Sequence, residues 1–529
     1  MSKIAIRLFA AIVVLICVSY PKPSQAQNGL QKVNHIIVVM QENHSFDNYF
    51  GALTYAPDSP YHRPGGMGPC DPDDHSCVDG LSCMADATGT LHCFNSNLDD
   101  NGSQVFAFHE PSRCVAPDLN HSWFPTHQEV NYSNPDSTLG NPLNNGFVRV
   151  NDSTEQIDNG VENPTDDRTI GFFNQSDIPF YYDLAQKFAI GDRHFSSLLG
   201  PTFPNRSYLL AATSFGHLTT DDIFPPVGST GYKPITGTIF DLLDKNNVTW
   251  ADYFQDAPQG ASFRLFTPSG RDPHFLPLAT FLAQAAADTL PSVSFVDPNF
   301  GLTGTATEND EHPPTDIQRG QAYVAQVLSA VRNGPNWKDS IIFLTYDEHG
   351  GFYDHADPPQ APQNHALNPD GINPGQCEDL SNPPSSEQPG GGAECSSNPL
   401  STTDTSVKDA ELLCPAMTAN PTGPYPADCP NFNQLGVRIP FVAISPFSKP
   451  HYVSHVVGDH TSMLALIEKR FLTTASGTRQ HLTLRDEYAH TLEDMFDFSR
   501  SPSLNTVLTE ALPPANDCTP STGPAQTTP

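Results

Sequence analysis

Short apolar runs, separated by long polar stretches rich in Gly and Pro, dominate the pattern of this chain. Four such runs cover residues 35–40, 292–296, 340–345 and 438–444. Their nearly continuous apolar character and their content of β-branched residues are typical of strands that are covered on both faces of a sheet. We therefore predict that these runs form the centre of a buried sheet.

A helix is predicted between the second and the third run. Val324, Val327, Leu328 and Val331 recur at helical spacing, and the sequence Asn-Gly-Pro at 333–335 ends the segment. A similar pattern at residues 461–471 predicts a helix after the last run. Strand, helix and strand in this order form a βαβ unit, so the predicted fold class is α/β, with a mostly parallel central sheet flanked by helices.

Two long insertions interrupt this pattern. The chain holds 51 prolines and 36 glycines, and they concentrate at about 55–167 and 357–435. We predict one catalytic domain over residues 27–510 that carries both insertions, followed by a flexible tail at 511–529.

The cysteines gather in the two insertions. The first holds Cys70, Cys77, Cys83, Cys93 and Cys114, the second holds Cys377, Cys395, Cys414 and Cys429, and Cys518 lies in the tail. None of these cysteines forms a CxxC pair, so disulfides that fasten the insertions are favoured over zinc sites. The sequence leaves the pairing open.

The N-terminus has the pattern of an export signal. Lys3 and Arg7 precede an apolar run at 8–20, and Ser24-Gln25-Ala26 is typical of a cleavage site. We predict a signal peptide at 1–26 and a secreted or periplasmic protein, with an uncleaved membrane anchor as the alternative.

The charge balance restricts the partners of the protein. There are 26 basic and 59 acidic residues, which give a net charge of −33. Such a surface repels nucleic acids, and it also repels strongly anionic membranes. We expect no nucleic-acid partner, no obligate protein partner, and at most transient contact with a membrane surface.

Polar side chains follow directly after two of the predicted strands. Glu42 and Asn43 follow the first run, and Asp347 and Glu348 follow the third. Ligands of open parallel sheets bind beyond the carboxyl ends of the strands, and carboxylate and amide oxygens suit a hard divalent cation such as Ca²⁺ or Mg²⁺. A single divalent metal ion is therefore predicted here. The alternative is that these residues only form turns and helix caps.

Thr202 is the candidate nucleophile. It lies in Gly200-Pro201-Thr202-Phe203-Pro204, just ahead of a helix-like segment, where backbone N–H groups and the helix dipole favour phosphate. A hydroxyl there that also binds a metal would attack phosphorus more easily. The alternative is an ordinary helix cap. Among the histidines, His121, His312 and His355 are candidates for acid–base work, and spacing alone does not decide between them.

Five motifs, in this order, resemble those of the bacterial phospholipase C and acid phosphatase phosphoesterase family. Glu42-Asn43-His44-Ser45-Phe46-Asp47 with Phe50-Gly51 resembles ENxSFDxxFG, and Thr202 to Arg206 is similar to TxPNR. Asp347 to His355 resembles DExxGxxDHV, except that Ala356 replaces the valine. Gly436 to Phe447 and Asp459 to Phe471 are similar to the closing motifs of the family.

The resemblance implies an alkaline-phosphatase-like sandwich and a catalytic site. Its metal would be held by Glu42, Asn43, Thr202, Asp347 and Glu348, and Thr202 would form a covalent phosphothreonine. His121 and His312 would hold phosphoryl oxygens or protonate the leaving group. Asn205 would contact phosphate, whereas Arg206 would either do the same or form an ion pair within the fold.

The implied activity is that of a secreted, metal-dependent phosphoesterase. Hydrolysis of phospholipids, as in a phospholipase C, is favoured because the segment 250–254 lacks the histidine pair that some acid phosphatases carry there. An acid phosphatase that acts on soluble phosphomonoesters is the alternative. A non-catalytic secreted binding protein is the alternative outside enzymes.

Overall fold

The computed structural model describes residues 29–514 except 67, 111, 115–117, 134–142, 153–156, 159–160, 163–166, 219, 221–231, 264–272, 303, 363–368 and 373–431. The predicted signal peptide, most of the second insertion with its four cysteines, and Cys518 lie outside the described residues. In the part of the chain that is described, no helix combines the length and the apolar character needed to cross a bilayer.

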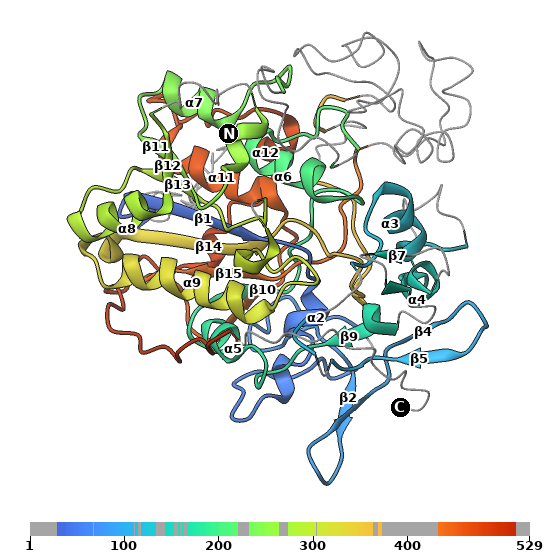
Figure 1. Cartoon of the computed structure of the whole chain (residues 1–529). Helices are drawn as coiled ribbons and strands as arrows, with labels where there is room; N and C mark the ends of the chain where they lie inside the picture. The colour runs from blue at the N-terminus through green and yellow to red at the C-terminus, as the bar shows by residue number, and fades with distance from the viewer. Residues whose placement is uncertain are drawn as a thin grey trace, which may run out of the picture.

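Within the described residues, the centre of the fold is one sheet of eight strands in the order β12-β11-β13-β1-β14-β15-β10-β16. Their bounds are Phe275–Pro277 for β12, Trp250–Phe254 for β11, Val293–Val296 for β13, His35–Gln41 for β1, Ser340–Tyr346 for β14, Phe441–Ile444 for β15, Ala189–Gly191 for β10 and Tyr452–Ser454 for β16. Because β1 and β14 are long and central, they fix the level at which the neighbouring strands end (Figure 1).

The predicted mostly parallel α/β sheet is confirmed. β1 pairs in parallel with both β13 and β14, and β11 pairs in parallel with β12 and β13. The predicted βαβ unit is β13, α9 (Ile317–Arg332) and β14, and its helix carries the chain past β1.

The last predicted strand, β15, starts later than predicted, and it does not run parallel to its neighbours. It begins at Phe441 rather than at 438, directly after Pro440, which cannot donate a ladder hydrogen bond. β15 then runs antiparallel to both β14 and β10. The sheet is therefore mixed on this side.

The two faces of the sheet are covered by different helices. Ile36, Val38 and Met40 of β1 pack into an apolar cluster with α6 (Thr202–Ala211), α7 (Ile239–Lys245) and α11 (His460–Phe471). Ile37 and Val39 point the opposite way, into a cluster with α5 (Pro179–Lys187), α8 (Leu278–Ala287) and α9. This alternation explains why the strands read as continuously apolar. Figure 1 shows the resulting three layers, with α6 and α11 above the sheet and α9 below it.

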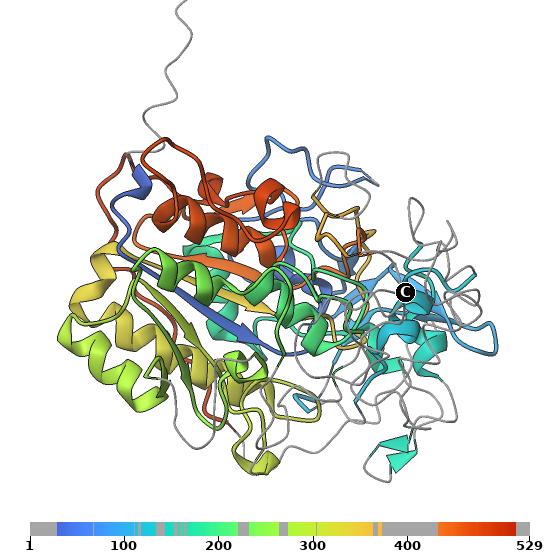
Figure 2. The ribbon, with the colours of Figure 1, turned by 90° about the horizontal axis from the view of Figure 1, so that it is seen from above.

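The first insertion forms structure of its own. It contains the hairpins β2–β3 (Cys83–Ala85 and Leu91–Cys93) and β4–β5 (Ser96–Leu98 and Gln104–Phe106), and the helices α3 (Trp123–Val130) and α4 (Phe147–Asn151). Its strand β6 (Phe108–His109) pairs with β9 (Gly171–Phe172). These elements gather beside one end of the sheet in both views (Figures 1 and 2).

Disulfides fasten this insertion, as the sequence predicts. They join Cys70 to Cys77 and Cys83 to Cys93, and Cys114 is disulfide-bonded as well. A small apolar cluster that includes Cys83, Cys93 and residues of β5, β6 and α4 completes its core.

Candidate active site

The registration of two strands brings the predicted metal-binding residues together. β1 and β14 pair from His35↔Ser340 to Gln41↔Tyr346, so both chains leave the sheet at the same level. The backbone N–H of Asn43 donates to Oδ1 of Asp347 over 3.2 Å. We call Glu42–Asn43 and Asp347–Glu348 the acidic tips. All four residues are buried, so the tips form one cluster at the carboxyl end of the sheet.

The two tips touch through their backbones. Asn43 has a φ of 64°, a left-handed conformation that asparagine tolerates better than most residues. Gly350 has a φ of 63°, and a Cβ atom added there would lie 2.4 Å from the carbonyl oxygen of Asn43. Only a glycine therefore allows this approach, and Gly350, two residues after Glu348, sets the spacing between the two loops.

Arg206 links the tips electrostatically. Its Nη2 lies 2.9 Å from Oε1 of Glu42, and its Nε lies 3.1 Å from Oδ2 of Asp347. The alternative in which Arg206 forms ion pairs within the fold is thus the arrangement that the structure shows. Burial raises the pKa of Glu42 to about 7, although the Arg206 charge opposes this rise. The guanidinium therefore offsets only part of the negative charge of the cluster.

Thr202 belongs to the same helix as Arg206. It is the first residue of α6, and Pro201 is the N-cap, so Thr202 lies one position further into the helix than predicted. Residues four apart share a helix face, which places Thr202 on the side of α6 that meets the acidic tips. Thr202 is buried, and its hydroxyl makes no hydrogen bond to any residue that the structure describes.

Asn205 holds the loop that leads to Thr202. Its Oδ1 accepts from the backbone N–H groups of Ser197 and Leu198, over 2.9 and 3.1 Å. Its Nδ2 donates to the carbonyl oxygens of Gly200 and Pro201, over 2.7 and 3.1 Å. These bonds use the whole side-chain amide, so Asn205 is a brace for the Thr202 loop here. Its contact with phosphate stays a prediction.

His121 and His312 lie beside each other, although one comes from the first insertion and the other from the loop after β13. Their ring centroids are 5.9 Å apart. His121 donates from Nδ1 to the carbonyl oxygen of Leu119 over 2.8 Å, and its Nε2 lies 3.4 Å from Nδ2 of Asn43. His312 donates from Nδ1 to the carbonyl oxygen of Pro313 over 2.6 Å. Both predicted histidines therefore belong to the cluster of the acidic tips.

Carboxylates around His312 favour its protonated form. Burial lowers the pKa of His312, but Asp118, Glu42 and Asp310 outweigh burial and raise the pKa to about 10. Its Nε2 lies 3.8 Å from Oδ2 of Asp118. These carboxylates therefore favour the imidazolium form of His312 at neutral pH.

A buried triad that the sequence did not predict orients Glu348. Nδ1 of His349 lies 3.2 Å from Oε2 of Glu348, and Nε2 of the same ring lies 2.7 Å from Oε2 of Glu129. Burial lowers the pKa of His349, but both carboxylates outweigh it and raise the pKa to about 9. Glu129 lies in α3, so the insertion supplies a contact that supports an acidic tip.

A second unpredicted group fixes the turn before His312. The carboxylate of Glu311 is fully buried and accepts hydrogen bonds from the hydroxyls of Tyr49 and Tyr346, each over 2.6 Å, and from that of Tyr181. Glu311 has a φ of 77°, a conformation that costs energy for a residue with a side chain. The tyrosine hydroxyls hold this strained residue, and with it the position of His312.

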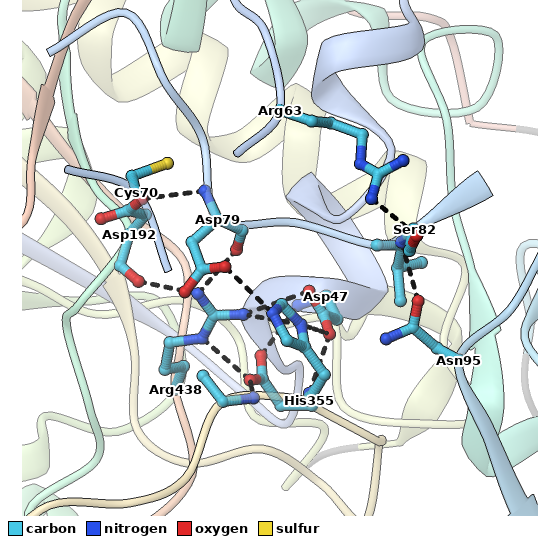
Figure 3. Close-up of polar contacts among 12 residues, drawn as sticks. Asp47, Arg63, Cys70, Asp79, Ser82, Asn95, Asp192, His355 and Arg438 are labelled. Atoms are coloured by element: carbon cyan, nitrogen blue, oxygen red, sulfur yellow. Dashed lines mark hydrogen bonds and ion pairs between the residues drawn. The ribbon is translucent and has the colours of Figure 1, made fainter. Parts of the chain in front are cut away.

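The remaining motif residues form a separate ion cluster. Arg438 bonds to Asp354 over 2.8 Å and to Asp47 of α2 (Phe46–Phe50) over 3.2 Å. Nδ1 of His355 lies 2.6 Å from Oδ2 of Asp47, and its Nε2 lies 3.2 Å from Asp79 (Figure 3). His355 is thus engaged in joining α2 to the loop after β14. His460 likewise braces the sheet edge, because its Nε2 donates to the carbonyl oxygen of Tyr346 over 2.9 Å.

A mostly parallel sheet with buried carboxylates, two histidines and a helix-start threonine at its carboxyl end is typical of an α/β enzyme, and the site is a candidate metal site. Residues 33–473 match the profile of the Phosphoesterase family, and the chain belongs to this family. It is therefore a hydrolase that acts on phosphoester bonds.

Relatives extend over most of the chain. It is 28% identical to "Non-specific phospholipase C6" of Arabidopsis thaliana, over 90% of this chain and 74% of that protein. It is 26% identical to "Phospholipase C B" of Mycobacterium tuberculosis, over 93% of this chain and 84% of that protein. The structure of human ectonucleotide pyrophosphatase/phosphodiesterase 5 superposes on 60% of this chain and 94% of its own, with 10% identity and a TM-score of 0.29, a likeness too weak to support an inference.

Replacement of Gly350 by alanine is expected to separate the acidic tips. The new Cβ atom would overlap the backbone of Asn43, and the φ of 63° would be strained. We expect the free energy of unfolding to fall by at least about 2 kcal/mol. We also expect the variant to lose most of the hydrolytic activity. The matched control is Gly477→Ala, because Gly477 also has a positive φ, of 88°, but no atom lies within 4 Å of the added Cβ. Equal activity of the two variants would contradict this account.

The His355 cluster is expected to make stability depend on pH. Burial lowers the pKa of His355, but Asp47 and Asp79 outweigh it and raise the pKa to about 10. A histidine whose pKa is raised on folding stabilises the folded state fully below its unfolded-state pKa of about 6.5. This stabilisation is lost gradually as the pH rises to the folded-state pKa of about 10. Chemical denaturation should therefore show that the stability difference between wild type and His355→Gln shrinks from pH 7 to pH 10. A constant difference would exclude a charged His355.

Proposed function

We propose that the protein is a metal-dependent phospholipase C, which cleaves phospholipids on the glycerol side of the phosphate through a phosphothreonine intermediate. The observation that carries the proposal is the junction of α6 with both acidic tips. There, Arg206 binds Glu42 and Asp347 while Thr202 occupies the same helix face. The names of the relatives support the choice of a phospholipid substrate.

The donor set fits one hard divalent cation, held by Glu42, Asn43, Thr202, Asp347 and Glu348. Oδ1 of Asn43 and Oε1 of Glu348 are buried and accept no hydrogen bond from the described residues. Buried oxygens of this kind are normally satisfied, and oxygen donors favour Ca²⁺ or Mg²⁺. When bound, such an ion would neutralise charge on the phosphoryl group and lower the pKa of a coordinated hydroxyl.

The protein's own residues divide the reaction between them. The backbone N–H groups of the first turn of α6 favour binding of the phosphate. The hydroxyl of Thr202 loses its proton to solvent, Oγ1 attacks phosphorus, and the bond from phosphorus to the glycerol oxygen breaks. His312 donates its proton to that oxygen, so diacylglycerol leaves as the neutral alcohol. Water then gives a proton back to His312 and its oxygen attacks phosphorus. The bond from phosphorus to Oγ1 breaks, Thr202 regains a proton from solvent, and the phosphorylated head group is released.

His121 and Arg206 serve the phosphate rather than the leaving group. His121 is held by Leu119 beside Asn43, from where it would bind a phosphoryl oxygen. Arg206 is anchored by both tips, and its Nη1 is buried without a hydrogen-bond partner among the described residues. That free donor makes Arg206 a candidate for phosphate contact, in addition to its ion pairs. The retention of all these groups leaves the hypothesis of a non-catalytic binding protein without support.

Replacing Thr202 by alanine is expected to abolish the activity. We expect hydrolysis of phosphatidylcholine vesicles to fall by at least about 10³-fold, with unchanged thermal stability, because only the nucleophile is removed. Chelator should inhibit the wild type, and added divalent cation should restore it. Thr478→Ala, in an exposed turn, is the control. Unchanged turnover in Thr202→Ala would refute the nucleophile, and faster turnover of a soluble phosphomonoester by the wild type would favour an acid phosphatase.

We also propose that the protein is exported and that the signal peptide is cleaved after Ala26. The disulfides of the first insertion support this proposal, since such bonds persist in oxidising compartments. N-terminal sequencing of the protein from the periplasm or the medium should begin at Gln27. Recovery of the full-length chain in the membrane fraction would support the uncleaved anchor instead.

A further inference from the structure

A second group of carboxylates lies in the first insertion, outside the acidic tips. Asp99 and Asp100 occupy the turn of the β4–β5 hairpin, and Asp152 is the C-cap of α4. One carboxylate oxygen from each residue lies within 4.8 Å of the other two. We call these three residues the hairpin cluster.

No basic side chain among the described residues forms an ion pair with the hairpin cluster. Within the described chain, none of its three residues forms an ion pair with Lys, Arg or His. The nearby Arg149 donates from Nε to the backbone carbonyl of Asp99 over 3.1 Å, and its guanidinium carbon lies 5.2 Å from the ring centre of Tyr132. Three carboxylates at this separation repel one another, and the repulsion is strongest where a member is buried.

Asp152 is the buried member, and one of its oxygens has no partner. The residue is 2% exposed, and its Oδ2 accepts from the backbone N–H of Asp100 over 3.2 Å. Its Oδ1 is buried and makes no hydrogen bond with the residues described. Leaving such an oxygen unsatisfied costs about 1–3 kcal/mol or more. The geometry therefore calls for a positive ligand between the three side chains.

We propose that Asp99, Asp100 and Asp152 bind a Ca²⁺ ion. A cation between them would satisfy Oδ1 of Asp152 and remove the repulsion at once. The donors are all oxygens, which disfavours zinc and copper, and a hairpin turn offers irregular geometry, which suits calcium better than magnesium. Water would complete the coordination. This site is independent of the proposed catalytic function.

Such an ion would anchor the insertion to the active site. Asp152 directly follows Asn151, whose Nδ2 donates to Oε1 of Glu129 over 3.1 Å. Oδ1 of Asn151 accepts from the backbone N–H of Asn120 over 2.7 Å. Glu129 supports His349, and Asn120 precedes His121. Calcium would thus tie the β4–β5 hairpin to Asp152, which directly follows Asn151, the residue from which both contacts to the active site begin.

The test compares wild type with the double variant Asp99→Asn/Asp100→Asn. Isothermal titration calorimetry of the full-length protein with CaCl₂ should show one ion fewer in the variant, with a Kd for the lost ion of about 0.1–1 mM. Asp71→Asn/Asp73→Asn, on an exposed turn, changes the net charge equally and should keep that ion. Thr202→Ala should keep it as well, which separates this outcome from the catalytic proposal.

Thermal unfolding gives a second measurement with a predicted reversal. In chelator, the Asp99→Asn/Asp100→Asn variant should melt at or above the temperature of the wild type, because the repulsion is reduced. In 10 mM Ca²⁺ the wild type should gain about 2–4 °C relative to the variant. Equal calcium stoichiometry in the two proteins would overturn the proposal. The proposal would also be overturned if the Asp99→Asn/Asp100→Asn variant were more stable than the wild type both in chelator and in 10 mM Ca²⁺. That result would mean that the carboxylates of the cluster share a proton instead of binding calcium.

Discussion

The structure depends on holding carboxylates together where they repel one another. Two unit charges about 4 Å apart interact by about 4 kcal/mol at an effective dielectric constant near 20. The parallel register of β1 and β14 places Glu42 and Asp347 at the same edge of the sheet. The close contact between Asn43 and Gly350 keeps the two loops that carry these carboxylates from moving apart. Arg206 partly offsets the repulsion, and the negative charge that it leaves is what the proposed metal site requires. A buried cluster of this kind opposes folding, which is expected where a function needs concentrated charge.

Much of the fold could be predicted because its signals are local. The register of apolar residues in β1, β13 and β14 and the helical spacing in α9 each reflect burial within a few residues of the chain. The direction of β15 has no such signal, because a short buried strand has the same composition in either direction. Its start was predicted three residues early because Val437 to Ile439 are buried without being in a strand, and Pro440 then separates them from the ladder.

The candidate site was predictable only where its residues follow strands or occur in motifs. The structure places His121 and His312 beside the acidic tips, and it places Thr202 on the helix whose Arg206 binds both tips, but the roles of these residues stay predictions. The groups that orient them were missed. Glu129 and His349 are 220 positions apart, and nothing in the sequence around Glu129 marks it as a partner of His349. Glu311 stands next to His312, but the three tyrosines that bind it come from α2, α5 and β14. Such contacts exist only after the chain has folded.

In the proposed mechanism the first insertion contributes to the active site, and this changes where substrate selectivity should be sought. The sheet supplies the acidic tips and α6 supplies Thr202, and in that mechanism these groups can act on any phosphoester. His121 and the Glu129 contact to His349 come from the insertion, which also carries the disulfides and the hairpin cluster. An element that carries the histidine proposed to bind phosphate must keep its position to within a fraction of an ångström, and cross-links help a segment rich in turns to do so. The disulfides and the hairpin cluster therefore belong to the same requirement as the active site, and differences in substrate among relatives should follow the insertion rather than the sheet.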